Sequence, residues 1–108
     1  MAIHHAVPAE IIDVRPLEAK LRESKTSVLV KTETLELIRI VIPAGKQLPP
    51  HRVDGEITVQ CLEGRIVFDA NGAERELAQG EMLYLAGGST HALRGIDDSS
   101  VLVTILLR

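Results

Sequence analysis

Aromatic residues are scarce in this chain of 108 residues, which contains no Trp, one Tyr and one Phe. Proteins that bind nucleobases or sugar rings often stack them on aromatic side chains, so this scarcity disfavours both ligand classes. Cysteine occurs once, as Cys61. A single cysteine excludes a disulfide within the chain and is typical of proteins from a reducing compartment.

Long apolar runs and clusters of basic residues are also missing. No apolar stretch approaches the roughly 20 residues that cross a membrane, and the N-terminal residues do not resemble a secretory signal peptide. The formal charge of −3 is spread along the chain without a basic patch, which disfavours nucleic acid as a partner. We therefore expect a cytoplasmic protein that binds neither nucleic acid nor membrane.

The first 25 residues differ from the rest of the chain and predict an N-terminal arm with a short helix or strand. The one helical pattern is residues 16–22, where Pro16 suits the first helical position and Glu18 and Arg22 are spaced to pair. Such a helix has at most two turns and needs packing to be stable. The domain proper is predicted to span residues 26–108.

From residue 26 onward the sequence predicts short strands separated by glycine and proline turns. Asn71-Gly72 is a strong hairpin signal, and Leu48-Pro49-Pro50 reads as an extended segment without ladder donors at its prolines. The run 101–107 is apolar at successive positions and predicts a strand covered on both faces. This pattern indicates an all-β sandwich or barrel. The expected strands are 27–31, 35–42, 57–62, 65–69, 75–77, 82–85, 92–94 and 101–107.

Two segments carry a family resemblance. The first runs from Gly45 through His51 and Glu56 to Gly64, and the second reads GEMLYLAGGSTHALRG from Gly80 to Gly95. Both resemble the paired motifs of the cupin superfamily (RmlC-like), here as a small single-domain member. The resemblance implies a double-stranded β-helix, the cupin or jelly-roll barrel. It covers roughly residues 34–107.

The metal motif of that family is degenerate in this chain. The resemblance places three histidines and one glutamate around a divalent metal, and His51 and His91 occupy two of those positions. The other two positions hold Val53 and Ile57. A bulge at Gly55 could turn Glu56 inward instead, which leaves Glu56 open as a third ligand. Zinc, iron, nickel or manganese is then the candidate cofactor.

The barrel interior is the predicted binding pocket. Strand alternation places Ile57, Val59 and Cys61 on one face, and the resemblance turns that face inward. Cys61 is either a soft-metal ligand or a small apolar filler. Tyr84 either caps the pocket with its hydroxyl or belongs to the core. The predicted pocket residues are His51, His91, Val53, Ile57, Val59, Cys61 and Tyr84.

Three roles remain open on these residues. The first is a binding module that holds one small, apolar or weakly polar molecule in the barrel, oriented by His51 and His91. The second is a metal-dependent cupin enzyme of the dioxygenase or isomerase type that uses the same two histidines, and its catalytic residues are unknown. The third is a structural role as half of a homodimer. Similar small cupins usually pair and often exchange N-terminal strands, which residues 26–42 would supply.

Overall fold

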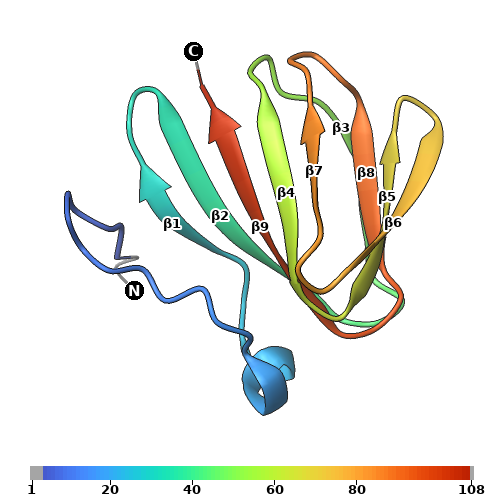
Figure 1. Ribbon diagram of the computed structural model, residues 1–108, viewed down its shortest axis with the longest axis horizontal. Coiled ribbons are helices and arrows are strands. Elements are labelled where there is room, and N and C mark those ends of the chain that lie inside the picture. The colour runs from blue at the N-terminus through green and yellow to red at the C-terminus, as the bar shows by residue number, and fades with distance from the viewer. Residues whose placement is uncertain (1–3, 108) are drawn as a thin grey trace.

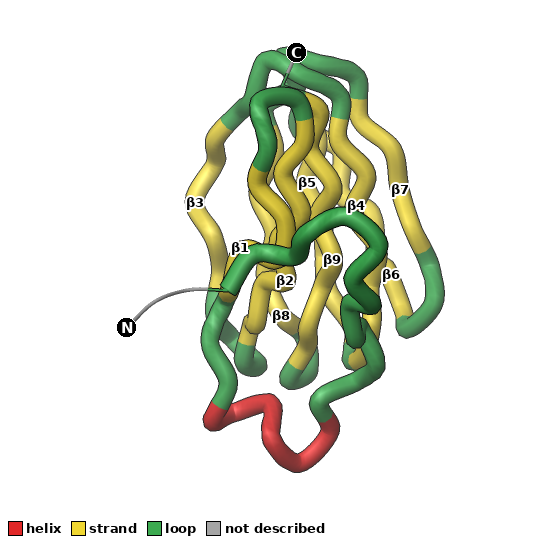
Figure 2. Tube along the Cα trace, turned by 90° about the vertical axis from the view of Figure 1, so that its left-hand side faces the viewer, coloured by secondary structure: helices red, strands yellow, loops and turns green. Residues whose placement is uncertain are grey.

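The computed structural model describes residues 4–107, which form a curved sandwich of two antiparallel sheets (Figures 1 and 2). The larger sheet has the order β1-β2-β9-β4-β7 and the smaller sheet the order β3-β8-β5-β6. No helix in this range is long and apolar enough to cross a membrane. The elements are η1 (Glu18–Glu23), β1 (Ser27–Lys31), β2 (Leu35–Ile42), β3 (Gln47–His51), β4 (Ile57–Glu63), β5 (Arg65–Ala70), β6 (Ala73–Ala78), β7 (Met82–Leu85), β8 (His91–Gly95) and β9 (Ser99–Leu106).

The strand predictions are confirmed, because runs of apolar and β-branched residues between turns do form the ladders. The bounds of β1, β2 and β7 are those expected, and β4, β5, β6, β8 and β9 differ from expectation at their ends only. β3 is the exception: the Pro49-Pro50 segment does join the smaller sheet, but its ladder with β8 is interrupted between Leu48 and His51. Proline has no N–H to donate, so the interruption follows from the sequence.

The core lies between the two sheets and is built from inward-facing side chains of both. In the larger sheet, Ile38 of β2 pairs with Val103 of β9, which pairs with Val59 of β4. Residues paired across a sheet share a face, so this row points into the sandwich together. Phe68 of β5 and Leu93 of β8 meet it from the smaller sheet and are buried.

The N-terminal arm packs on the lower end of the sandwich through a 3-10 helix (Figure 1). The helix spans Glu18–Glu23 rather than beginning at Pro16, and Leu21 is its buried anchor. The expected pairing of Glu18 with Arg22 does not form, because the Arg22 guanidinium donates to Asp98, 2.7 Å away, in the turn before β9. The arm is therefore held by the barrel and not by its own helical contacts.

Candidate ligand-binding cavity

A small cavity of about 60 Å³ lies inside the sandwich toward its upper end. Among the described residues that line it, His51 and His91 alone are polar. The apolar lining comes from six strands and the loop after β3, and consists of Ile38, Ile40, Leu48, Val53, Ile57, Val59, Phe68, Leu93, Val103 and Ile105. The cavity is therefore an apolar chamber with one polar spot.

His91 is the buried member of that polar spot. It begins β8, is 6% exposed, and its ring stacks on Phe68 with centroids 5.6 Å apart. Its Nδ1 lies 3.0 Å from the Ser89 carbonyl oxygen, which only accepts, so Nδ1 carries the proton and donates. Burial lowers the pKa of His91; the bond to Ser89 opposes this and the nearby His51 adds to it. The ring is thus biased toward its neutral form.

His51 is the exposed member and stands at the end of β3, where the interrupted ladder resumes opposite His91. The two rings meet edge to face with centroids 4.2 Å apart, and their Nε2 atoms are 3.1 Å apart. The Nδ1 of His51 lies 3.3 Å from the Pro49 carbonyl oxygen. Both imidazoles line the cavity and that of His51 also reaches solvent, so the pair connects the two.

The proton positions in this pair are restricted by the backbone. With Nδ1 of His91 protonated, its neutral ring presents a lone pair at Nε2 toward His51. His51 satisfies that lone pair if it carries its own proton on Nε2, and its longer Nδ1 contact to Pro49 is then not a hydrogen bond. If both rings instead keep Nδ1 protonated, two lone pairs face each other and a cation must lie between them. The pair is therefore satisfied without a cation when His51 carries its proton on Nε2, and it requires a cation when both rings carry their protons on Nδ1.

The predicted apolar pocket residues lie where alternation places them. Val53, Ile57 and Val59 all line the cavity. Cys61 also faces inward and is fully buried, but it lies below the cavity, where its Sγ donates to the Glu63 carbonyl oxygen at 3.4 Å. Burial raises the pKa of the Cys61 thiol. The placement suits an apolar filler and not a thiolate ligand.

Tyr84 and Glu56 are corrections to the predicted pocket. Neither points into the cavity, since Tyr84 is 59% exposed and its hydroxyl donates to the Glu56 carboxylate on the outer face of the larger sheet. Ile57 faces inward, so its neighbour Glu56 faces outward by ordinary alternation, and the expected bulge at Gly55 does not turn it. Gly55 has another role: a Cβ there would lie 1.6 Å from the Leu106 carbonyl oxygen.

His51 and His91 supply two of the four side-chain ligands that the family's metal site has. Two imidazole nitrogens about 3 Å apart suit adjacent positions on one ion, and His51 and His91 offer them. In residues 4–107, however, no group of three or more His, Cys, Asp or Glu side chains is placed to hold a metal. Val53 and Ile57 make the remaining wall apolar. The protein ligands present therefore do not close a site by themselves.

Several lining residues were not anticipated. The cavity is also lined by Ile38, Ile40, Val103 and Ile105. They follow the same alternation as Ile57 and Val59, so the sequence could have predicted that they face the barrel interior as well. Phe68 gave no comparable signal, because one buried aromatic residue looks the same whether it packs a core or supports a histidine.

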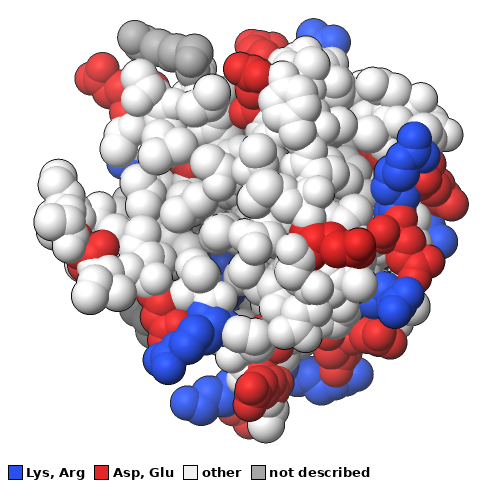
Figure 3. Space-filling view, viewed as in Figure 1, with Lys and Arg blue, Asp and Glu red and all other residues white. Residues whose placement is uncertain are grey.

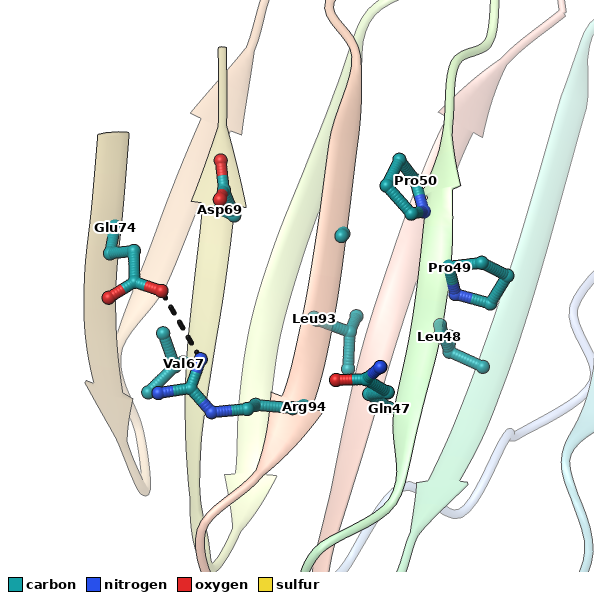
Figure 4. Close-up of a pocket in the computed structure, with 10 residues that line it drawn as sticks. Gln47, Leu48, Pro49, Pro50, Val67, Asp69, Glu74, Leu93 and Arg94 are labelled. Atoms are coloured by element: carbon teal, nitrogen blue, oxygen red, sulfur yellow. Dashed lines mark hydrogen bonds and ion pairs between the residues drawn. The ribbon is translucent and has the colours of Figure 1, made fainter. Parts of the chain in front are cut away.

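A wider hollow of about 230 Å³ lies on the smaller sheet, between β3 and β6 (Figure 4). Its charged side chains are already engaged: Arg94 pairs with Glu74 at 3.2 Å, and Asp69 accepts from the Gly72 amide. The internal pairing leaves this surface with little to offer a ligand, so the cavity of the histidine pair is the better candidate.

Two antiparallel sheets that close around an inner cavity define a double-stranded β-helix of the jelly-roll type. Residues 38–107 match the family model of the cupin domain. The chain therefore belongs to the cupin family and is a small protein of the RmlC-like superfamily. None of the curated proteins matches it.

Solved structures agree on the fold. A conserved protein of unknown function from Streptococcus pyogenes has a TM-score of 0.77 at 17% identity, covering 100% of this chain and 96% of its own. An RmlC-like cupin from Desulfovibrio desulfuricans has a TM-score of 0.75 at 26% identity, with coverages of 91% and 98%. Salicylate 1,2-dioxygenase from Pseudoaminobacter salicylatoxidans has a TM-score of 0.69 at 17% identity, but only 24% of that chain is covered against 74% of this one.

Proposed function

We propose that this cupin binds one small, uncharged, weakly polar molecule inside its barrel, anchored by the His51–His91 pair. The observation that carries the proposal is a cavity whose lining is apolar except for two linked imidazoles. Binding sites for small molecules commonly have this composition, in which apolar walls supply affinity and a few polar groups fix orientation. A neutral ligand is favoured because burial biases His91 toward its neutral form.

The size of the cavity restricts the ligand. At about 60 Å³ the space is far smaller than the roughly 300 to 1,000 Å³ of sites for drug-sized molecules. Engineered apolar cavities near 150 Å³ hold benzene, so a smaller molecule is expected here. The exposed His51 is the movable wall, because the ladder beside it is interrupted at Pro49 and Pro50.

The test is an NMR titration of the ¹⁵N-labelled protein with aliphatic alcohols of two to six carbons. We expect saturable shifts that centre on His51 and His91 and vanish above a limiting chain length. Val59→Phe, which fills the chamber, should abolish them, whereas Thr58→Ala on the outer face of the same strand should not. Shifts that persist in Val59→Phe, or no saturation with any alcohol, would contradict the proposal.

A metal-dependent enzyme is the second candidate, favoured by the two Nε2 atoms that converge at 3.1 Å. His51 and His91 would hold the ion, water or substrate would complete it, and the ion would supply Lewis-acid or oxygen chemistry of the dioxygenase or isomerase type. The similar salicylate 1,2-dioxygenase lends the first type some support.

Elemental analysis separates the two candidates. Protein expressed with added iron, manganese, nickel and zinc is compared with His51→Ala from the same medium. Near-stoichiometric metal that disappears in His51→Ala would establish the metal site. Metal well below stoichiometry in both proteins would remove it and leave the binding role.

A further inference from the structure

The turn between β5 and β6 holds the only asparagine of the chain, Asn71, and Gly72 follows it. Ala70 pairs with Ala73, so these two residues make the whole turn, and their φ angles of 53° and 82° are positive, as a two-residue hairpin turn requires. Both residues are exposed, and a Cβ on Gly72 would meet nothing within 4 Å. The peptide bond between Asn71 and Gly72 is therefore open to solvent and has room around it.

An asparagine that precedes an unhindered glycine amide can be lost by an internal reaction, and asparagine is among the thermally labile residues. The glycine nitrogen bonds to Cγ of the asparagine side chain, the Cγ–Nδ2 bond breaks, and ammonia leaves behind a cyclic imide. Water then opens the imide at one of its two carbonyls and gives aspartate or isoaspartate. Because the glycine amide must give up its proton as the ring closes, a base beside that amide accelerates the step.

Asp69 places a carboxylate on that proton. Its Oδ1 accepts a hydrogen bond from the Gly72 amide at 3.1 Å. Figure 3 shows charged side chains of both signs on the side of the molecule where Figure 1 places β5 and β6. The other carboxylates of these two strands, Glu74 and Glu76, each pair with an arginine. Among the described residues Asp69 has no such cationic partner, so its carboxylate is available as a base.

Asp54-Gly55 offers a comparison within the same chain, because an aspartate can close the same ring with loss of water. Here the backbone is tightly packed. A Cβ on Gly55 would lie 1.6 Å from the Leu106 carbonyl oxygen, and a Cβ on Gly87 would lie 2.2 Å from the Asp54 carbonyl oxygen. Contacts with β9 and with the loop after β7 therefore hold this peptide in place, whereas the turn at Asn71 is free to reach the ring geometry.

We propose that Asn71 is a site of self-modification, at which the Gly72 nitrogen closes the imide, the Asp69 carboxylate acts as the base, and water converts the residue to aspartate and isoaspartate. The Gly72 amide proton passes through Asp69 to the departing ammonia. The net change is the uptake of one water and the release of one ammonia, so the reaction needs no oxidant or reductant.

The modified residue lies beside the candidate binding cavity. Asn71 and His91 line one surface hollow of about 570 Å³, and the Asn71 amide donates to the Thr90 carbonyl oxygen at 3.0 Å. Conversion adds a carboxylate to this hollow, and isoaspartate also adds one carbon to the backbone of the turn. The surroundings of His91 therefore change as the protein ages.

Peptide mapping tests the proposal on folded protein incubated at mildly alkaline pH, with chromatographic separation of isoaspartate and fragmentation to assign the residue. Residue 71 should accumulate as aspartate and isoaspartate, while Asp54 should form no isoaspartate. Asp69→Asn keeps an oxygen that accepts the Gly72 amide but is a far weaker base, and it should slow conversion of Asn71 at least about threefold. In urea, where the fold no longer holds Asp69 beside the amide, the two proteins should react at nearly the same rate.

Three outcomes would overturn the proposal. The first is an Asn71 that stays intact in the folded protein while it reacts in urea. The second is an equal rate of conversion in folded wild type and folded Asp69→Asn. The third is a difference between these two proteins that is as large in urea as in the folded state, because the base would then act without the fold.

A second measurement tests the effect on the candidate site and needs no ligand, so it does not depend on the proposed binding function. In ¹⁵N NMR spectra, the amide signals of Thr90 and His91 should shift as the wild type ages. They should not shift in Asn71→Gly, which tolerates the positive φ of the turn but has no side-chain amide to lose. Unchanged signals in fully converted wild type, or equal shifts in Asn71→Gly, would contradict the effect on His91.

Discussion

At the upper end of the barrel His51 and His91 face each other across an interrupted ladder, whereas at the lower end the Glu63 carboxylate joins three segments of the chain. Glu63 is 7% exposed and accepts from the Leu17 and Glu18 amides and from the Ser100 hydroxyl. Both oxygens of the Glu63 carboxylate therefore accept hydrogen bonds from nearby groups of the protein. The polar groups of the histidine pair instead face a cavity and solvent. The lower end is therefore suited to holding the chain rigidly, and the upper end to exchanging a ligand with solvent.

The largest expected effect comes from removing the carboxylate at the lower end. Glu63→Ala should lower the free energy of unfolding by about 3 kcal/mol, because it leaves two amides and a hydroxyl without their charged partner. Urea denaturation measures the change. Glu76→Ala is the control, since its ion pair with Arg65 is exposed and its loss should cost less than about 1 kcal/mol. Equal losses in the two variants would abolish the contrast between the ends.

The neighbouring turn should be nearly as sensitive. Gly64 has φ of +80°, and a Cβ there would lie 2.3 Å from the Asp98 carbonyl oxygen and from Ser99 Oγ. Gly64→Ala should cost about 2 kcal/mol or more in unfolding free energy, from strain together with the clash. Gly72→Ala, with φ of +82° and open space around the added methyl, isolates the strain alone and should cost about 1 kcal/mol. A Gly72 loss as large as that of Gly64 would refute the close packing of this turn.

The pH dependence of stability should follow Glu63. Burial raises the pKa of its carboxyl, but the bonds from Ser100, Leu17 and Glu18 and the charge of Arg39 lower it further, so the net shift is downward. A lowered folded-state pKa gives stability that is present above the unfolded value of about 4.3 and is lost as pH falls below it. The difference in unfolding free energy between wild type and Glu63→Gln should therefore shrink between pH 5 and the acid limit of folding. A difference that is constant with pH would contradict this assignment.

The smallest expected effect on stability lies at the upper end. His51→Ala should change the unfolding free energy by less than about 1 kcal/mol, because the ring is exposed and its partner can bind water instead. The same variant should lose the ligand-induced NMR shifts or the bound metal. A loss of stability comparable to that of Glu63→Ala would show that the histidine pair is a structural clamp and not a binding site.

The strands could be predicted from the sequence because each depends on a local residue pattern that also holds in the folded barrel. The runs 27–31, 35–42 and 82–85 became β1, β2 and β7 because each is apolar or β-branched and ends at turn residues. The two motifs that contain His51 and His91 lie on β3 and at the start of β8, which are neighbouring strands, and the structure pairs the two histidines across them.

Local sequence patterns predicted only part of the candidate site. The sequence offers Glu56 as a ligand only through a bulge at Gly55, and Tyr84 as either a cap on the pocket or a core residue. Neither lines the cavity, because a single step along a strand reverses the facing of a side chain. Glu63 had no sequence signal, because the groups it binds lie 45 and 46 residues earlier and 37 residues later in the chain.

The sequence by itself determined the strands, their turns and the two histidines that share a cross-strand position, since these depend on local preference and spacing. Tertiary structure alone decided which residues the cavity contains, how the imidazole nitrogens meet, and that Glu63 fastens the arm. These features depend on the facing of each strand and on contacts between distant segments, and both are settled only when the two sheets close on one core.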